Sequence, residues 1–318
     1  MAARAIYPMR RSARAGASGM VLASFVPPRA VRELRDLTRR RTEVTVMKGQ
    51  EAQRLEKELE DTGMKLTSVL SDVLGVTGRA ILTALINGVR DPRALAALAV
   101  GRARNKTDAL VDALDGTFTD HHAWMCRHLL AQIDHFNALV AELDARIAAM
   151  ANDHDDDLAY LDTIPGIGRK AAEIILAETG GDMAQFATAA HLASWIGVVP
   201  GINESAGVNK SARTRNGNKH LKRILGVAAL SAIRGKDTYY QDFYRRTAAR
   251  RGGKRALVAL MHKIVTAIWH VLHGHTAFRD LGADYLPKRD PERAMRRMRR
   301  EANRLGLTVR FDPIEQPA

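Results

Sequence analysis

The chain has 318 residues, with 49 lysines and arginines against 35 acidic residues, which gives a formal net charge of +14. Hydrophobic residues make up 46% of it. That content excludes a disordered basic tail and is enough to form the cores of two or more domains. The single cysteine, Cys126, excludes a disulfide framework and suits a reducing cytoplasm. The excess of positive charge predicts a polyanionic partner, either nucleic acid or an anionic membrane.

The membrane alternative has little support in the sequence. The best candidate span, residues 256–272, is interrupted by His262, Lys263 and His270. Residues 1–20 are basic and lack acids, as transit peptides do, but they show no amphipathic apolar face. Aromatic residues make up only 5% of the chain, while Ala, Leu, Arg and Glu abound. This composition predicts a mainly α fold that binds nucleic acid.

The first part of the chain reads as a basic leader over residues 1–23 and a helical segment over 24–151. Pro27-Pro28 marks a helix start, and Thr62-Gly63 follows its expected end at Asp61. Apolar residues recur at roughly helical spacing between these points: Val31, Leu34, Leu37, Val44, Met47, Leu55 and Leu59. Shorter helices fit residues 64–115, where glycines punctuate the pattern.

A three-heptad apolar seam follows, with alternating steps of four and three residues that are typical of a coiled coil. Its members are Leu129, Ile133, Phe136, Val140, Leu143, Ile147 and Met150. The seam could pair with the helix over residues 31–59 of the same chain, or with another subunit. We therefore expect a homo-oligomer through the Leu129–Met150 seam, with the hairpin within one chain as the alternative.

Residues 152–286 read as a second, compact helical domain, and 287–318 as a basic tail that frays at the end of the chain. The acidic run at 152–157 is expected to link the two domains as a solvated helix start, where acids suit the helix dipole. A divalent-ion site is the alternative, but the run lacks the glycine and distal glutamate of a calcium loop. The segment Thr163-Ile-Pro-Gly-Ile-Gly168 then predicts a helix-hairpin-helix, with the following helix starting near Arg169. The free N–H groups of that helix could accept a phosphate. The alternative is a hairpin that only packs. The candidate phosphate contacts here are Gly166, Gly168, Arg169 and Lys170.

The most informative stretch is residues 200–223, where serines lie among seven cationic or titratable side chains with no acid from Ser205 to Arg223. Concentrated positive charge favours bound phosphate, and a serine hydroxyl there could attack it. We take Ser205 as the candidate nucleophile and Ser211 as the fallback; a phosphate-binding turn without covalent chemistry is the alternative. The candidate nucleic-acid contacts are Gly207, Lys210, Arg213, Arg215, Gly217, Lys219 and Arg223.

Two other groups of side chains have residue types that can carry chemistry. The late histidines at 262, 270, 273 and 275 lack a carboxylate or thiolate at metal-ligand spacing, so we expect packing and surface roles. Tyr239, Tyr240 and Tyr244 lead into paired arginines, but no ordered Arg/His set of a tyrosine recombinase surrounds them.

These motifs, taken in order, resemble the transposases of the insertion sequence 110/116/902 family, which includes Piv-type DNA invertases. The resemblance covers roughly residues 24–286. It rests on the helix opening from Phe25 to Arg41, the hairpin ending at Gly168, and the serine and basic motifs from Glu204 to Arg223. It implies recombination of DNA through a circular intermediate, in some members with a guide RNA from the element. It also implies a bacterial cytoplasmic, nucleoid-associated protein.

The resemblance further implies an N-terminal RuvC-like domain whose four acids bind Mg²⁺. Residues 1–23 contain no Asp or Glu. We therefore expect that domain to be missing, as in a frameshifted or internally started reading frame, with no metal ligand assignable here and no autonomous strand transfer. A non-catalytic nucleic-acid-binding regulator that dimerises with full-length transposase is the alternative. A helical adaptor for proteins is a third reading, and it predicts affinity insensitive to salt.

Overall fold

The computed structural model describes residues 27–201, 204–205, 207–209 and 213–312. The fold is mainly α, as predicted, and the β pairing among these residues is limited to a short hairpin and one antiparallel bridge between Pro200 and Thr214. The chain divides into two compact units. Unit 2 comprises Asp36–Asn152, and unit 1 comprises Met1–Arg35 together with Asp153–Ala318.

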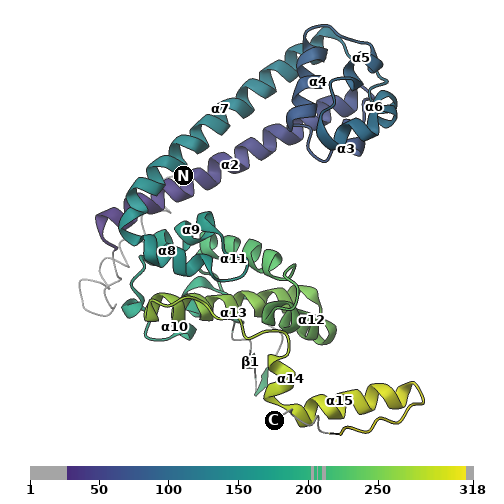
Figure 1. Ribbon diagram of the computed structural model, residues 1–318. Coiled ribbons are helices and arrows are strands. Elements are labelled where there is room, and N and C mark those ends of the chain that lie inside the picture. Colours follow the sequence, from purple (N-terminus) through teal and green to yellow (C-terminus); the bar gives the residue numbers. More distant parts are fainter. Residues whose placement is uncertain (1–26, 202–203, 206, 210–212, 313–318) are drawn as a thin grey trace, which may run out of the picture. The chain divides into compact units, whose positions relative to one another are not determined.

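Unit 2 is a long helical hairpin that carries a cap of short helices (Figure 1). Its two long helices are the part of α2 (Arg29–Asp61) from Asp36 onward, and α7 (Asp120–Ala151). The cap consists of α3 (Leu66–Val69), α4 (Val76–Ile86), α5 (Pro92–Ala96), η1 (Gly101–Lys106) and α6 (Thr107–Ala113). Leucines from α2 and α4 and Cys126 of α7 share one buried core under this cap.

The Leu129–Met150 seam lies along α7. Leu129, Ile133, Leu143 and Ile147 are buried, whereas Phe136, Val140 and Met150 are half-buried. Two polar pairs join α7 to α2: the Arg41 guanidinium lies 3.0 Å from the Asp144 carboxylate, and Lys48 Nζ donates to Asn137 Oδ1 at 3.1 Å. The seam therefore faces α2 of the same chain, and its pairing with a second subunit remains a prediction.

Burial along the whole of α2 differs from the pattern predicted from the sequence. Leu34, Val44, Leu55 and Leu59 are buried as expected, but Met47 is exposed. Polar residues occupy other buried positions of α2, namely Thr38, Arg41 and Glu51. Arg41 can be buried because Asp144 neutralises it.

Unit 1 is built around one long helix, α13 (Gly253–Gly274), against which α8, α10, α11 and α12 pack. The surrounding elements are η2 (Asn152–His154, which begins at the unit boundary), α8 (Asp155–Asp162), α9 (Arg169–Thr179), η3 (Met183–Gln185), α10 (Ala189–Ile196), β1 (Glu204–Ser205), β2 (Val208–Asn209), α11 (Lys219–Ala232) and α12 (Tyr239–Arg251). Residues 152–157 form η2 and the first turn of α8, in agreement with the helix start expected for this acidic run. Three aspartates in that first turn suit the positive end of the helix dipole.

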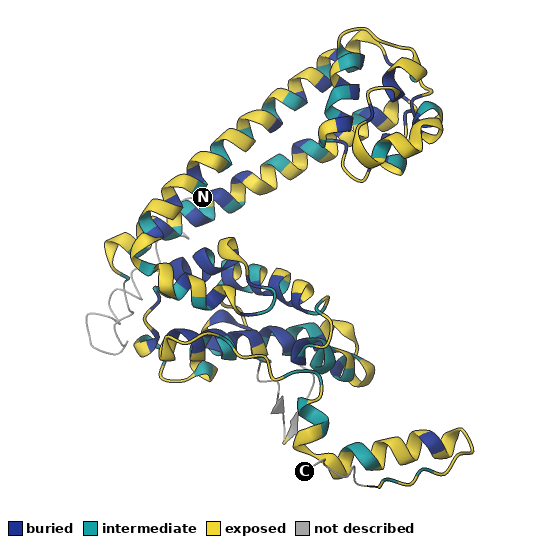
Figure 2. Ribbon diagram, viewed as in Figure 1, coloured by how far each residue is buried: buried dark blue, intermediate teal, exposed yellow. Residues whose placement is uncertain are grey.

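By length and composition α13 could cross a membrane, and it is the one such helix among the described residues. However, half of its most apolar window is buried inside the protein, including Leu260, Ile264 and Ile268. Figure 2 shows buried positions along much of α13. The helix is therefore accounted for as the core helix of unit 1.

The basic C-terminal segment is helical rather than frayed. It forms α14 (Tyr285–Arg289) and α15 (Pro291–Arg304). The start of this segment contacts the beginning of α12 and the turn before it. The backbone N–H of Ala283 donates to the carbonyl of Asp237 in that turn, and the Tyr285 ring meets the Tyr239 ring of α12 edge-on at 5.7 Å.

Candidate nucleic-acid interface

The Ser205 segment forms a β-hairpin arm. At its base the Gly201 N–H donates to the Arg213 carbonyl at 2.9 Å, and the Arg215 N–H donates to the Val199 carbonyl at 3.2 Å. Farther out, β1 and β2 pair antiparallel with Ser205 opposite Val208. Gly207 makes the turn between them at a φ of +75°, a left-handed conformation that suits glycine. Ser205 therefore lies beside the tip of a hairpin.

Two predicted residues of this arm, Lys210 and Ser211, lie outside the described residues. Arg213, Arg215 and Gly217 lie on its returning strand and are exposed. Gly217 contacts the Ile196 carbonyl at the end of α10, which holds this strand against the body of unit 1. The arm therefore projects from a fixed base.

The N-terminus of α11 follows directly and carries the next cations. Asn218 caps the helix: its Oδ1 accepts from the backbone N–H groups of His220 at 3.0 Å and Leu221 at 3.1 Å. Lys219 and Arg223 are exposed in the first turns. Lys222 Nζ donates to Thr214 Oγ1 at 2.7 Å and to the Arg215 carbonyl at 3.3 Å, so it fastens the arm to the helix. Arm and helix N-terminus together form one positively charged surface, which suits a phosphate.

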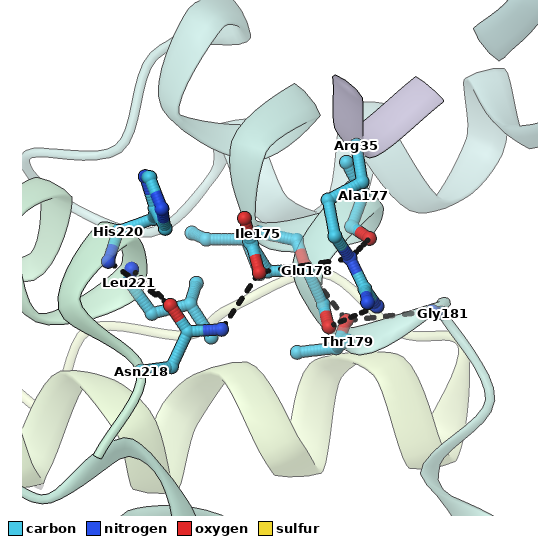
Figure 3. Close-up of polar contacts among 9 residues, drawn as sticks. All are labelled: Arg35, Ile175, Ala177, Glu178, Thr179, Gly181, Asn218, His220 and Leu221. Atoms are coloured by element: carbon cyan, nitrogen blue, oxygen red, sulfur yellow. Dashed lines mark hydrogen bonds and ion pairs between the residues drawn. The ribbon is translucent and has the colours of Figure 1, made fainter. Parts of the chain in front are cut away.

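A buried carboxylate positions this helix start (Figure 3). Glu178 of α9 is 1% exposed, and its Oε2 accepts from Asn218 Nδ2 at 2.7 Å. The same carboxylate lies 3.6 Å from Arg35 Nε, and Arg35 also donates to the carbonyls of Ala177 and Glu178. The capping residue of α11 is thus held by α9 and by the first turns of α2, all within unit 1.

The 163–168 turn connects α8 to α9, and its two glycines have different surroundings. Gly166 has a φ of +90° and packs directly on the backbone carbonyl of Ala228 in α11. Gly168 caps α9 with an extended backbone, and the nearest atom to a Cβ there would be Asp162 Oδ1 at 3.9 Å. Gly166 is therefore explained by packing, whereas Gly168 lies at an open helix N-terminus.

Arg169 is engaged inside the protein. Its guanidinium lies 2.6 Å from the Asp155 carboxylate and 3.4 Å from that of Glu173. The hydrogen bond to Asp155 is the largest cause of the raised pKa of Arg169. Lys170 is exposed on the same turn. The sequence did not reveal this pairing, because Asp155 and Arg169 are 14 residues apart and meet only where α8 packs against α9.

The two predicted clusters lie at opposite ends of a helix pair. α9 and α11 pack together, with Gly166 against the C-terminal half of α11 and Glu178 against its N-cap. The ten residues from Gly168 to Glu178 span about 15 Å of helix. The arm with α11 and the turn at 163–170 are therefore separate surfaces of unit 1, and the structure does not bring them into one site.

Packing accounts for Tyr239 and Tyr240, whereas His270, His273 and His275 are exposed. Tyr239 and Tyr240 are buried, and burial is the main cause that raises the pKa of both hydroxyls. Burial also lowers the pKa of His262. Among the residues that the structure describes, no group of three or more His, Cys, Asp or Glu side chains could hold a metal ion. We therefore assign no Mg²⁺ site to these residues.

Comparison with known proteins places this surface in a family context. Residues 158–245 match the family model described as the Transposase IS116/IS110/IS902 family. The pilin gene-inverting protein of Moraxella bovis is 28% identical over 152 residues, which cover 46% of this chain and 47% of that protein. The insertion element IS110 uncharacterized 43.6 kDa protein of Streptomyces coelicolor is 30% identical over 138 residues, which cover 43% and 33%.

A third relative extends the match along the chain. The insertion element IS900 uncharacterized 42 kDa protein of Mycobacterium paratuberculosis is 27% identical over 215 residues, which cover 61% of this chain and 53% of that protein. The chain thus spans about half the length, or less, of these curated relatives. The resemblance to this transposase family is confirmed.

Proposed function

We propose that this protein is a DNA transposase or site-specific recombinase of the insertion-sequence type. The observation that carries the proposal is that the region matching the transposase family model, residues 158–245, contains the whole hairpin arm and α11. The cations that surround Ser205 in sequence therefore belong to the segment that resembles known transposases. The proposal includes DNA as the substrate and the bacterial cytoplasm as its location.

The arm and the N-terminus of α11 would hold a DNA phosphate. Lys219 and Arg223 are exposed beside a helix N-terminus, and Arg213 and Arg215 are exposed on the arm. Phosphate contacts of this kind position a nucleic-acid backbone without reading its sequence. Lys222 would support them indirectly, because it holds Thr214 and the Arg215 carbonyl at the base of the arm.

Ser205 would be the nucleophile, with Ser211 as the fallback. Its Oγ would attack the phosphorus of a phosphodiester and lose its proton, while the bond from phosphorus to one sugar oxygen breaks and that oxygen leaves as a hydroxyl. A sugar hydroxyl of a second DNA end would then attack the phosphoserine and release the serine. The nearby cations would stabilise the negative charge that spreads over the phosphoryl oxygens in both steps.

Three further features of the proposal concern partners. A second copy could bind along α7, where Phe136, Val140 and Met150 of the seam are half-buried. Light scattering of the purified chain tests this homo-oligomer.

A guide RNA from the element could bind the basic surface. Binding of the purified chain to an RNA transcribed from the DNA that flanks the gene tests this. Mg²⁺ would serve the family reaction at acids other than those described here, and no step above is assigned to it.

The proposal is tested by covalent capture. DNA duplexes from the flanks of the gene are prepared with sulfur in place of the bridging oxygen. A thiolate leaves without needing a proton, so this substrate tests the attack by serine alone and does not require the complete strand transfer that this chain is not expected to carry out by itself. We expect a protein–DNA adduct on Ser205 that is absent in Ser205→Ala, while DNA binding persists in that variant. An adduct lost only in Ser211→Ala assigns the fallback serine. DNA binding without any adduct contradicts the recombinase and leaves the non-catalytic nucleic-acid-binding regulator.

A further inference from the structure

The C-terminal helix α15 has a shape and charge that the proposed serine site does not use. It carries six arginines against two glutamates in 14 residues. Its start and end are set by local signals: Asp290 Oδ1 accepts from the Arg293 N–H at 3.0 Å, Pro291 occupies the first turn, and Gly306 follows the helix at a φ of +75°. The helix is therefore specified by its own sequence.

The arginines and the apolar residues lie on different faces of α15. Ala294, Met295, Met298 and Ala302 fall within about 100° of one another around the helix axis, at 100° per residue. Arg293, Arg297, Arg300 and Arg304 fall within about 60° on the other side at the same spacing. All six arginines are exposed, as the largely exposed ribbon of α15 shows (Figure 2).

Some of these arginines already have partners. Arg296 lies 3.3 Å from Glu292, Arg297 lies 3.6 Å from Glu301, and the Arg299 guanidinium lies 5.4 Å from the centre of the Phe311 ring. For Arg293, Arg300 and Arg304 the described part of the chain shows no ion pair. These three share one face and keep their charge available to a partner.

We propose that α15 is a second DNA-binding element, whose row of Arg293, Arg300 and Arg304 contacts the phosphate backbone of duplex DNA. The row runs from Arg293 to Arg304, eleven helical steps or about 16 Å of helix. One DNA strand presents a phosphate about every 3.4 Å along its axis, so the row covers roughly five phosphates. The proposal rests on the proposed function only for the choice of DNA as the polyanion.

An anionic membrane fits this helix less well than DNA does. Helices that lie in a membrane interface insert Trp, Phe or Leu side chains from their apolar face. Within α15 the apolar face offers only alanines and methionines. The positive charge of α15 therefore favours DNA, because its apolar face lacks the large side chains that insert into a membrane.

The test measures how DNA affinity depends on salt. A short labelled DNA duplex is titrated with the full chain and with the triple variant Arg293→Gln, Arg300→Gln, Arg304→Gln, since glutamine preserves helix propensity. Three lost phosphate contacts should reduce the slope of log affinity against log salt by about 2.7. The wild-type chain should then lose about 40-fold more affinity than the variant between about 50 and about 200 mM salt.

Two comparison proteins make the result specific. A matched variant, Arg93→Gln, Arg102→Gln, Arg146→Gln, removes the same charge from exposed positions of unit 2. It should keep the wild-type slope. The variant Arg293→Lys, Arg300→Lys, Arg304→Lys should keep the wild-type slope, because phosphate neutralisation needs the charge and not the guanidinium. Circular dichroism checks that each variant retains its helices.

The proposal is overturned if the slope of log affinity against log salt is unchanged in the α15 variant. It is also overturned if the slope falls equally in the unit 2 variant, because the loss of net charge alone would then explain the result. It is also overturned if the α15 variant loses binding to phosphatidylglycerol vesicles while its DNA binding stays unchanged. Covalent capture on Ser205 is a separate readout. A reduced slope without capture therefore leaves this proposal standing while the recombinase proposal fails.

Discussion

The two glycines of the 163–168 turn give a sharp test of the fold, because only one of them is enclosed. In Gly166→Ala the new methyl group would meet the carbonyl of Ala228, a backbone group that cannot rotate away. The φ of +90° at Gly166 adds strain, since an alanine in a left-handed conformation costs about 1–2 kcal/mol. Overpacking adds about 1–3 kcal/mol. We expect unit 1 to lose about 2–5 kcal/mol of unfolding free energy.

The matched control is Gly168→Ala, two residues along the same turn. There the backbone is extended and the space is open, so the new methyl group meets nothing closer than 3.9 Å. Alanine is a poorer N-cap than glycine, which lowers the stability. It also reduces the conformational entropy of the unfolded chain, which raises the stability. We expect a change within about 0.5 kcal/mol.

Urea unfolding followed by tryptophan fluorescence measures both variants. Trp195 and Trp269 report on unit 1, and a Trp124→Phe background removes the signal of unit 2, where Trp124 is 59% exposed. Thermal unfolding should show a fall of about 5–15 °C for Gly166→Ala. Equal stability of the two variants would refute the close packing of the turn on α11. It would reopen the interpretation of Gly166 as a phosphate contact.

The remaining predictions concern buried groups. Glu178→Ala should cost unit 1 about 3–5 kcal/mol of unfolding free energy, because Asn218 and Arg35 lose a buried charged partner. Urea unfolding measures this loss, and a loss below about 1 kcal/mol would contradict the positioning role of Glu178. Ile147→Ala should cost unit 2 about 2–5 kcal/mol of unfolding free energy, since this seam residue is 0% exposed. An unchanged thermal unfolding temperature would show that Ile147 does not contribute to the core. Cys126 should resist iodoacetamide at about pH 8 until urea is added, because burial, reinforced by the charge of Glu58, raises its pKa to about 11; rapid native labelling would refute this. Since the thiol ionises at lower pH when unfolded, its contribution to stability is present below about pH 9 and is lost as the pH rises toward 11.

Local signals in the sequence predicted much of the helical fold. The Pro27-Pro28 pair preceded α2, Thr62-Gly63 followed its end, and α9 began at Arg169 as expected. These features depend on neighbouring residues, so a single sequence reveals them.

The features that sequence reasoning missed depend on contacts between distant segments. Arg41 is buried because Asp144 lies against it, 103 residues away. Gly166 is needed because the backbone of α11 packs on it. The separation of the two basic clusters follows from the way α9 and α11 pack, which neither motif encodes on its own.

Covalent capture with sulfur-bridged DNA from the flanks of the gene tests the central claim most directly. The account predicts an adduct whose modified peptide contains Ser205, with no adduct in Ser205→Ala at concentrations where that variant still binds DNA. An adduct that persists in both Ser205→Ala and Ser211→Ala, or saturable DNA binding with no adduct in the wild-type chain, would contradict the assignment of a serine recombinase.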